Sequence, residues 1–166
     1  MGGFEESNGA SLGGHILEKD GLLAALVMLE IFEYVKGQGK EPFEAFIDLW
    51  REFGYYATSN IPLTLKGPEA NKLRDLVMAK VEGYYKRVRA QEGEVIIAGK
   101  KVREAYRGED LAGFNEPGYK FVFLDGAYII IRPSGTEPKM RVYTETTHGD
   151  KVQAILQDGL KIAGLK

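Results

Sequence analysis

The sequence predicts an α+β protein in which an antiparallel sheet with two helices packed on it follows a mainly helical N-terminal segment. Three observations lead to this expectation. Apolar residues recur at helical spacing in two segments before residue 54. Later in the chain, short β-branched and aromatic runs alternate with turn residues, as in hairpins. Two further helical patterns, near residues 68–93 and 150–163, are long enough to cover such a sheet.

Two helices are expected in the first third of the chain. The first spans residues 20–36, with Asp20 as its N-cap. Its segment Leu22–Leu29 is apolar on all sides, which is typical of a helix that is buried against other elements. The second helix begins at Pro42 and runs to about Phe53.

The middle of the chain predicts a strand, a long helix and a short hairpin. Residues 55–65 have the composition of a strand. A helix is expected to begin after Gly67–Pro68 and to end near Gly93, because its apolar residues keep helical spacing. Residues 95–97 and 101–103 then flank a glycine-containing turn.

The clearest hairpin joins residues 121–124 to residues 127–131. Its turn is Asp125–Gly126, a dipeptide that suits a type I′ turn. A strand over residues 140–145 is expected to follow. Asp150 is then the predicted N-cap of the last helix, whose apolar residues share one face.

Composition and charge exclude several classes of protein. The net charge of the 166 residues is 22 − 24 = −2, so the chain lacks the broad positive field of a nucleic-acid binder. No basic segment followed by an apolar core marks a signal peptide, and the longest apolar run, Leu22–Leu29, is far shorter than the ~20 residues that span a bilayer. There is no cysteine. We therefore expect a cytoplasmic protein that binds neither nucleic acid nor membranes.

The segment Arg132–Arg141, which reads RPSGTEPKMR, carries the most informative chemistry. The guanidinium of arginine offers a rigid fork of donors that matches phosphate oxygens. Glycine lets a backbone N–H approach an anion, and Ser and Thr add hydroxyl donors. An ordinary connection between two strands also uses Pro, Ser and Gly. The residues alone therefore leave two interpretations open, a phosphate-binding loop and a plain turn.

Three segments resemble motifs of the phosphohexomutase family, which comprises the phosphoglucomutases and phosphomannomutases. Residues 132–145, RPSGTEPKMRVYTE, are similar to its phosphate-binding loop. Residues 3–9, GFEESNG, resemble its sugar-binding loop, whose core reads Glu-x-Ser-x-Gly. Residues 15–21, HILEKDG, resemble the His-x-x-x-Lys-Asp-Gly segment that opens the next helix. Three motifs in the family's order are more specific than any one of them.

The resemblance covers essentially the whole chain and implies two domains. Residues 1–53 resemble a remnant of the family's third, sugar-binding α/β domain, formed by a loop and two helices. Residues 54–166 resemble its C-terminal phosphate-binding domain, a four-stranded antiparallel sheet with two helices on one face. Because only Phe4 could belong to a strand before the sugar-binding loop, we expect the chain to be the C-terminal part of a longer enzyme.

The resemblance also assigns site residues. Those implied for phosphate binding are Arg132, Ser134, Gly135, Thr136, Lys139 and Arg141, and those implied for sugar binding are Glu5, Ser7 and Lys19. Alternatives stay open for four of them. Lys139 could be an ordinary strand residue, and Lys19 an exposed charge at the start of a helix. Glu5 and Ser7 could belong to a solvated turn.

The implied function is that of an isomerase in carbohydrate metabolism. The parent enzyme is expected to interconvert hexose 1-phosphate and hexose 6-phosphate as an intramolecular phosphotransferase. No segment resembles the family's catalytic phosphoserine loop or its magnesium loop of three aspartates, so we assign no catalytic and no metal-binding residue to this chain. Magnesium is expected to bind elsewhere in the parent enzyme, and this chain alone is expected to be inactive.

The expected partners are a hexose phosphate and the missing N-terminal domains of the same enzyme. Self-association through helix 20–36 is also expected, because its apolar surface lacks the sheet that it would cover in the family. An alternative function is a free-standing phosphate-binding module without catalysis.

Overall fold

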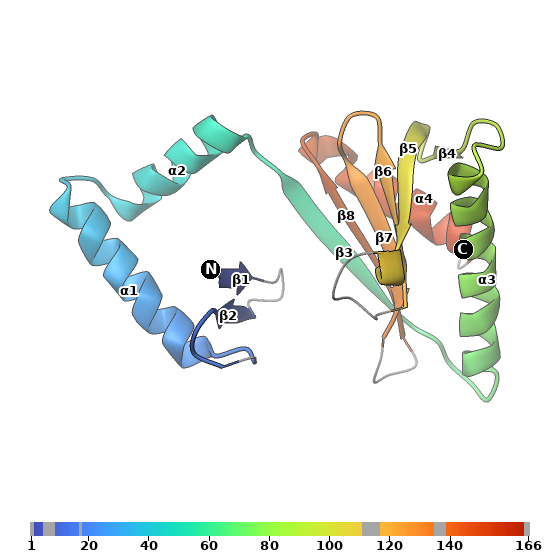
Figure 1. The fold of residues 1–166 in the computed structure, drawn as a ribbon, viewed down its shortest axis with the longest axis horizontal. Coiled ribbons are helices and arrows are strands. Elements are labelled where there is room, and N and C mark those ends of the chain that lie inside the picture. The colour runs from blue at the N-terminus through green and yellow to red at the C-terminus, as the bar shows by residue number, and fades with distance from the viewer. Residues whose placement is uncertain (1, 5–8, 17, 111–116, 135–138, 165–166) are drawn as a thin grey trace. The chain divides into compact units, whose positions relative to one another are not determined.

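Figure 1 shows the fold of the chain as a computed structural model. The structure describes residues 2–4, 9–16, 18–110, 117–134 and 139–164. The chain divides into two compact units, Met1–Tyr55 and Tyr56–Lys166. No helix of the described residues combines the length and the apolar character needed to cross a bilayer.

The first unit contains a short antiparallel ladder that the sequence analysis missed. Strand β1 (Gly2–Phe4) pairs with β2 (Ala10–Leu12), and their six residues stand opposite each other in register. The carbonyl of Ala10 accepts a hydrogen bond of 2.9 Å from the N–H of Asp20, which ties this ladder to the start of the following helix. Residues 1–53 are therefore more than the predicted loop and two helices.

Two helices complete the first unit, as predicted. Helix α1 spans Gly21–Gly37 and helix α2 spans Pro42–Phe53. Neither helix has a buried residue, and Leu22 is 82% exposed. The apolar surface that is typical of a buried helix is therefore open in this unit, because its described strands form only a two-stranded ladder.

The second unit is built on a six-stranded antiparallel sheet with the order β3-β8-β7-β6-β5-β4. Its strands are β3 (Ala57–Thr64), β4 (Ile96–Ile97), β5 (Lys100–Arg107), β6 (Tyr119–Phe123), β7 (Tyr128–Pro133) and β8 (Lys139–Thr146). The predicted count of four is wrong, since β3 pairs along the whole of β8 and the short β4 pairs with β5. Pro62 is tolerated in β3 because that strand lies at the sheet edge.

Helices α3 (Ala70–Arg89) and α4 (Val152–Ala163) pack on the sheet. Both contact β7 and both contact each other, and the core lies between them and the sheet. In β7 and β8, buried residues such as Ile131 and Val142 alternate with half-buried ones. The side chains of Arg132, Arg141 and Tyr143 therefore lie on the face away from the helices.

Two predicted details are wrong. Gly126 has a φ of +82°, but Asp125 does not have a positive φ, whereas a type I′ turn requires two. The hydrogen bonds from Gly126 N–H to Phe123 O, 3.1 Å, and from Phe123 N–H to Ala127 O, 2.8 Å, define a three-residue connection. Asp150 lies inside a short 3₁₀ turn, η2 (Gly149–Lys151), and makes no side-chain cap.

Candidate functional site

The predicted phosphate-binding segment connects β7 to β8. Arg132 is in β7 and Arg141 is in β8, and the two residues stand directly opposite each other in the ladder. The N–H of Ser134 donates a hydrogen bond of 2.8 Å to the carbonyl of Lys139, which joins the two ends of the connection. We call these two ends, with Arg132 and Arg141 beside them, the neck of the connection. The structure thus brings four of the six predicted residues together. Gly135 and Thr136, the other two, lie outside the described residues.

A tyrosine that the sequence analysis did not single out links the two arginines. The hydroxyl of Tyr143 accepts hydrogen bonds from Nη2 of Arg132, at 3.2 Å, and from Nη1 of Arg141, at 3.3 Å. The guanidinium carbon of Arg132 lies 5.5 Å from the centroid of the Tyr143 ring, within the range of a cation–π contact. The alternation of β8, which places residues 141 and 143 on one face, is the signal that could have found Tyr143.

A glycine on the neighbouring segment makes room for Arg132. A Cβ atom at Gly118 would lie 2.8 Å from Cβ of Arg132, which is closer than real Cβ atoms approach. The carbonyl of Gly118 accepts a hydrogen bond of 3.1 Å from the N–H of Gly108, which follows β5. This bond restrains the backbone at Gly118. The position of Arg132 therefore depends on the absence of a side chain at residue 118.

The predicted sugar-binding residues belong to the first unit. Glu5 and Ser7 lie outside the described residues. Lys19 is exposed just before α1, and its backbone N–H donates a hydrogen bond of 2.9 Å to Oε1 of Glu18. Because Lys19 and Arg132 belong to different units, a common site for them stays a prediction.

Asp20 and His15 form a helix cap in the first unit. Oδ1 of Asp20 accepts hydrogen bonds from the N–H groups of Leu22 and Leu23, both at 3.0 Å, which confirms the predicted N-cap. Nε2 of His15 lies 2.9 Å from Oδ2 of Asp20. The bond from Leu23, followed by that from His15, lowers the pKa of Asp20. His15, within the third motif, thus supports the start of α1, a role that the sequence analysis did not assign.

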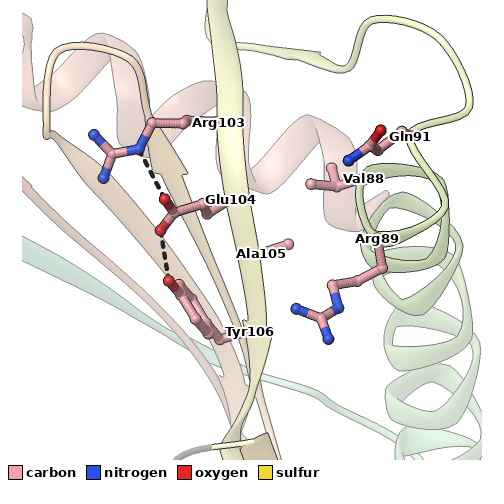
Figure 2. Close-up of a pocket in the computed structure, with 7 residues that line it drawn as sticks. All are labelled: Val88, Arg89, Gln91, Arg103, Glu104, Ala105 and Tyr106. Atoms are coloured by element: carbon pink, nitrogen blue, oxygen red, sulfur yellow. Dashed lines mark hydrogen bonds and ion pairs between the residues drawn. The ribbon is translucent and has the colours of Figure 1, made fainter.

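A shallow pocket of about 190 Å³ lies elsewhere, between the end of α3 and β5 (Figure 2). Its lining residues are Val88, Arg89, Gln91, Arg103, Glu104, Ala105 and Tyr106. The Tyr106 hydroxyl donates to Glu104, which lowers the pKa of Glu104 and raises that of Tyr106. Arg89 and Arg103 also line the pocket, but the Arg103 guanidinium is paired with the Glu104 carboxylate at 3.2 Å. The negative end of the α3 dipole further opposes a phosphate group there. We therefore assign the candidate site to the β7–β8 connection.

Comparison with known proteins defines the class. Residues 68–161 match the family profile described as the phosphoglucomutase/phosphomannomutase C-terminal domain. Residues 1–53 match the profile described as the alpha/beta/alpha domain III of the same family. The chain belongs to the phosphoglucomutase/phosphomannomutase family, which confirms the family predicted from the three motifs.

Individual relatives show how much of such enzymes the chain spans. It is 28% identical to a probable phosphomannomutase of Haemophilus influenzae, over 96% of this chain and 32% of that protein. It is 24% identical to the human glucose 1,6-bisphosphate synthase, over 95% of this chain and 27% of that protein. The crystal structure of the Paramecium phosphoglucomutase pp63/parafusin in its open form matches with a TM-score of 0.63 and 26% identity, over 96% of this chain and 29% of that one. The chain thus spans 27–32% of the length of these proteins.

Proposed function

We propose that this chain is the phosphosugar-binding C-terminal part of a phosphohexomutase, which interconverts hexose 1-phosphate and hexose 6-phosphate. The observation that carries the proposal is the pair of opposed arginines, Arg132 and Arg141, at the neck of the β7–β8 connection. Family membership supports the class of substrate.

The chemistry of the neck suits a phosphate dianion. Two guanidinium groups offer planar, charge-assisted donors to the phosphate oxygens. The hydroxyl of Ser134 and the ammonium of Lys139 come from the two ends of the same connection. In this role the site holds whichever phosphate of the substrate is not reacting, and such positioning is a large part of catalysis of phosphoryl transfer.

The names of the relatives support recognition of phosphate rather than of one sugar. One relative is named for a mannose phosphate and another for a glucose bisphosphate. Their names share a phosphorylated sugar and differ in the sugar itself. We propose that the arginine pair binds this common group, and that Glu5, Ser7 and Lys19 contact the sugar.

Catalysis and magnesium are proposed to belong to other domains of the parent enzyme. Within the described part of the chain, no three His, Cys, Asp or Glu side chains gather as metal ligands. The described residues therefore do not fit a magnesium site, and we derive no step through a metal. The purified chain is expected to show no turnover of glucose 1-phosphate or mannose 1-phosphate in a coupled assay, whereas turnover would contradict its proposed inactivity.

The affinity for a sugar phosphate distinguishes this proposal from the alternative of an independent phosphate-binding module. Titration with glucose 6-phosphate, with unphosphorylated glucose as the control, should give saturable binding in the millimolar range, because the other domains would supply the rest of the site. Saturation at micromolar ligand would favour the independent module. Binding of glucose as strongly as of its phosphate would contradict both.

A further inference from the structure

We propose that Tyr143 is a positioning residue that orders Arg132 and Arg141 before the phosphate group arrives. The inference rests on the proposed function of the β7–β8 connection and extends it to a residue outside the predicted site. Both arginines reach the same atom, the Tyr143 hydroxyl oxygen, at 3.2 and 3.3 Å. A phenol oxygen can accept hydrogen bonds, and here it accepts one from each guanidinium group.

The strand register explains how Tyr143 can contact both arginines. Arg141 and Tyr143 are two positions apart in β8 and share one face of the sheet. Arg132 stands opposite Arg141, and Ile130 stands opposite Tyr143, so Arg132 is a diagonal neighbour of the tyrosine. A diagonal neighbour is within reach of an aromatic or long side chain. The 5.5 Å contact between the Arg132 guanidinium and the Tyr143 ring adds a second restraint.

The neutrality of Tyr143 gives it a role that a carboxylate could not fill. A carboxylate between two arginines would hold them equally well, but its charge would cancel part of their attraction for a phosphate dianion. The phenol hydroxyl orders both side chains without adding a negative charge beside them. Arginine also loses much rotamer freedom when it is fixed, so arginines ordered in advance bind a ligand at a lower entropic cost.

The test is a comparison of Tyr143→Phe with Tyr106→Phe by NMR of the arginine side chains. Tyr143→Phe keeps the ring and removes the shared acceptor. Tyr106→Phe is the matched control, since the register from Tyr106 through Lys120 and Ile130 to Tyr143 places both tyrosines on the same face. The readout is the heteronuclear NOE of the Nε–Hε groups of Arg132 and Arg141 in the ligand-free 166-residue chain.

We expect Tyr143→Phe to lower the NOE of both arginines and Tyr106→Phe to leave both unchanged. The dissociation constant for inorganic phosphate should rise about tenfold in Tyr143→Phe, because the ligand must then immobilise two rotamer-rich side chains itself. Unchanged arginine NOEs in a folded Tyr143→Phe chain would overturn the inference. If the wild-type chain binds no phosphate, the proposed function fails, while the NOE comparison still decides whether Tyr143 orders the arginines.

Discussion

Arg132 and Arg141 stand directly opposite each other on β7 and β8, so the fold holds two like charges side by side at the neck of one loop. Like charges in this arrangement weaken a strand pair. A bound phosphate dianion would turn the same arrangement into an attractive one, which links the local architecture to the proposed ligand. We therefore propose a ligand-binding role for the opposed arginines.

Gly118→Ala should impair phosphate binding by moving Arg132. The new Cβ would lie 2.8 Å from Cβ of Arg132, and the bond between Gly108 and Gly118 restrains the backbone that would have to yield. We expect weaker binding of inorganic phosphate, measured by titration calorimetry, together with shifted Arg132 resonances. Gly83→Ala is the control, since a Cβ there meets nothing within 4 Å. Equal affinities in the two variants would show that Gly118 does not position the arginine.

Gly159→Ala should destabilise the second unit by about 1–2 kcal/mol. Overpacking destabilises a core by about 1–3 kcal/mol, and the better helix propensity of alanine offsets up to about 1 kcal/mol of that loss. Gly159 is buried in α4, where a Cβ would collide with Cδ1 of Ile129 and lie 2.9 Å from Cγ1 of Val142. Urea unfolding measures the loss.

Gly83→Ala again provides the matched control for stability. Gly83 is exposed within α3 and has open space around it, so alanine should stabilise the unit by about 0.5–1 kcal/mol. The two substitutions are chemically identical and should act in opposite directions. A stabilising effect of Gly159→Ala would contradict the described packing of α4 on the sheet.

The start of α1 should depend on pH through Asp20. Hydrogen bonds from Leu23 and His15 lower the pKa of Asp20, so its contribution to helix stability is complete above the unfolded pKa of about 3.9 and is lost as pH falls through the lower folded pKa. The amide shifts of Leu22 and Leu23 should follow that titration. Asp20→Asn, which still caps but does not titrate, should abolish it. Titration of those amides in the Asn variant would assign the effect to another group.

Self-association is expected to depend on the apolar surface of α1. Leu22 and Leu26 are 82% and 61% exposed there. Leu22→Lys combined with Leu26→Lys should lower the sedimentation coefficient at high protein concentration, because charged residues disfavour apolar contacts. Leu124→Lys, at an exposed leucine in the β6–β7 turn, should change it little. Wild-type chain that sediments as a monomer at every concentration would refute the expectation.

Local sequence signals predicted the helices and most strands of the fold. Pro42 marks the start of α2, and the cap at Asp20 marks that of α1. The count of four strands came from the family resemblance, whereas the residue patterns indicated a strand near each of β3 to β8. Those patterns did not show that β3 pairs with β8, because strand pairing is a long-range property. The prediction of a type I′ turn was wrong because Leu124 belongs to the connection between β6 and β7 and not to β6. The connection therefore has three residues, whereas the predicted turn has two.

The candidate site was predictable only in part. The arginine, serine and lysine residues indicate an anion site, because their side chains donate hydrogen bonds. Tyr143 is harder to identify from the sequence, because a tyrosine in a strand is ordinary. Its importance depends on the register that places two guanidinium groups beside one hydroxyl. Gly118 was missed for the same reason, since its contact with Arg132 arises only when β6 and β7 pair.

The most direct test of the central claim is the effect of inorganic phosphate on unfolding in wild-type, Arg132→Gln and Lys72→Gln chains. At ten times the dissociation constant, mass action predicts about 1.4 kcal/mol of added stability for the wild-type chain. Lys72, an exposed α3 residue paired with Glu69, controls for the loss of one charge. The account predicts that Lys72→Gln keeps this gain and that Arg132→Gln loses most of it. Equal stabilisation of all three chains would contradict a phosphate site at the β7–β8 connection.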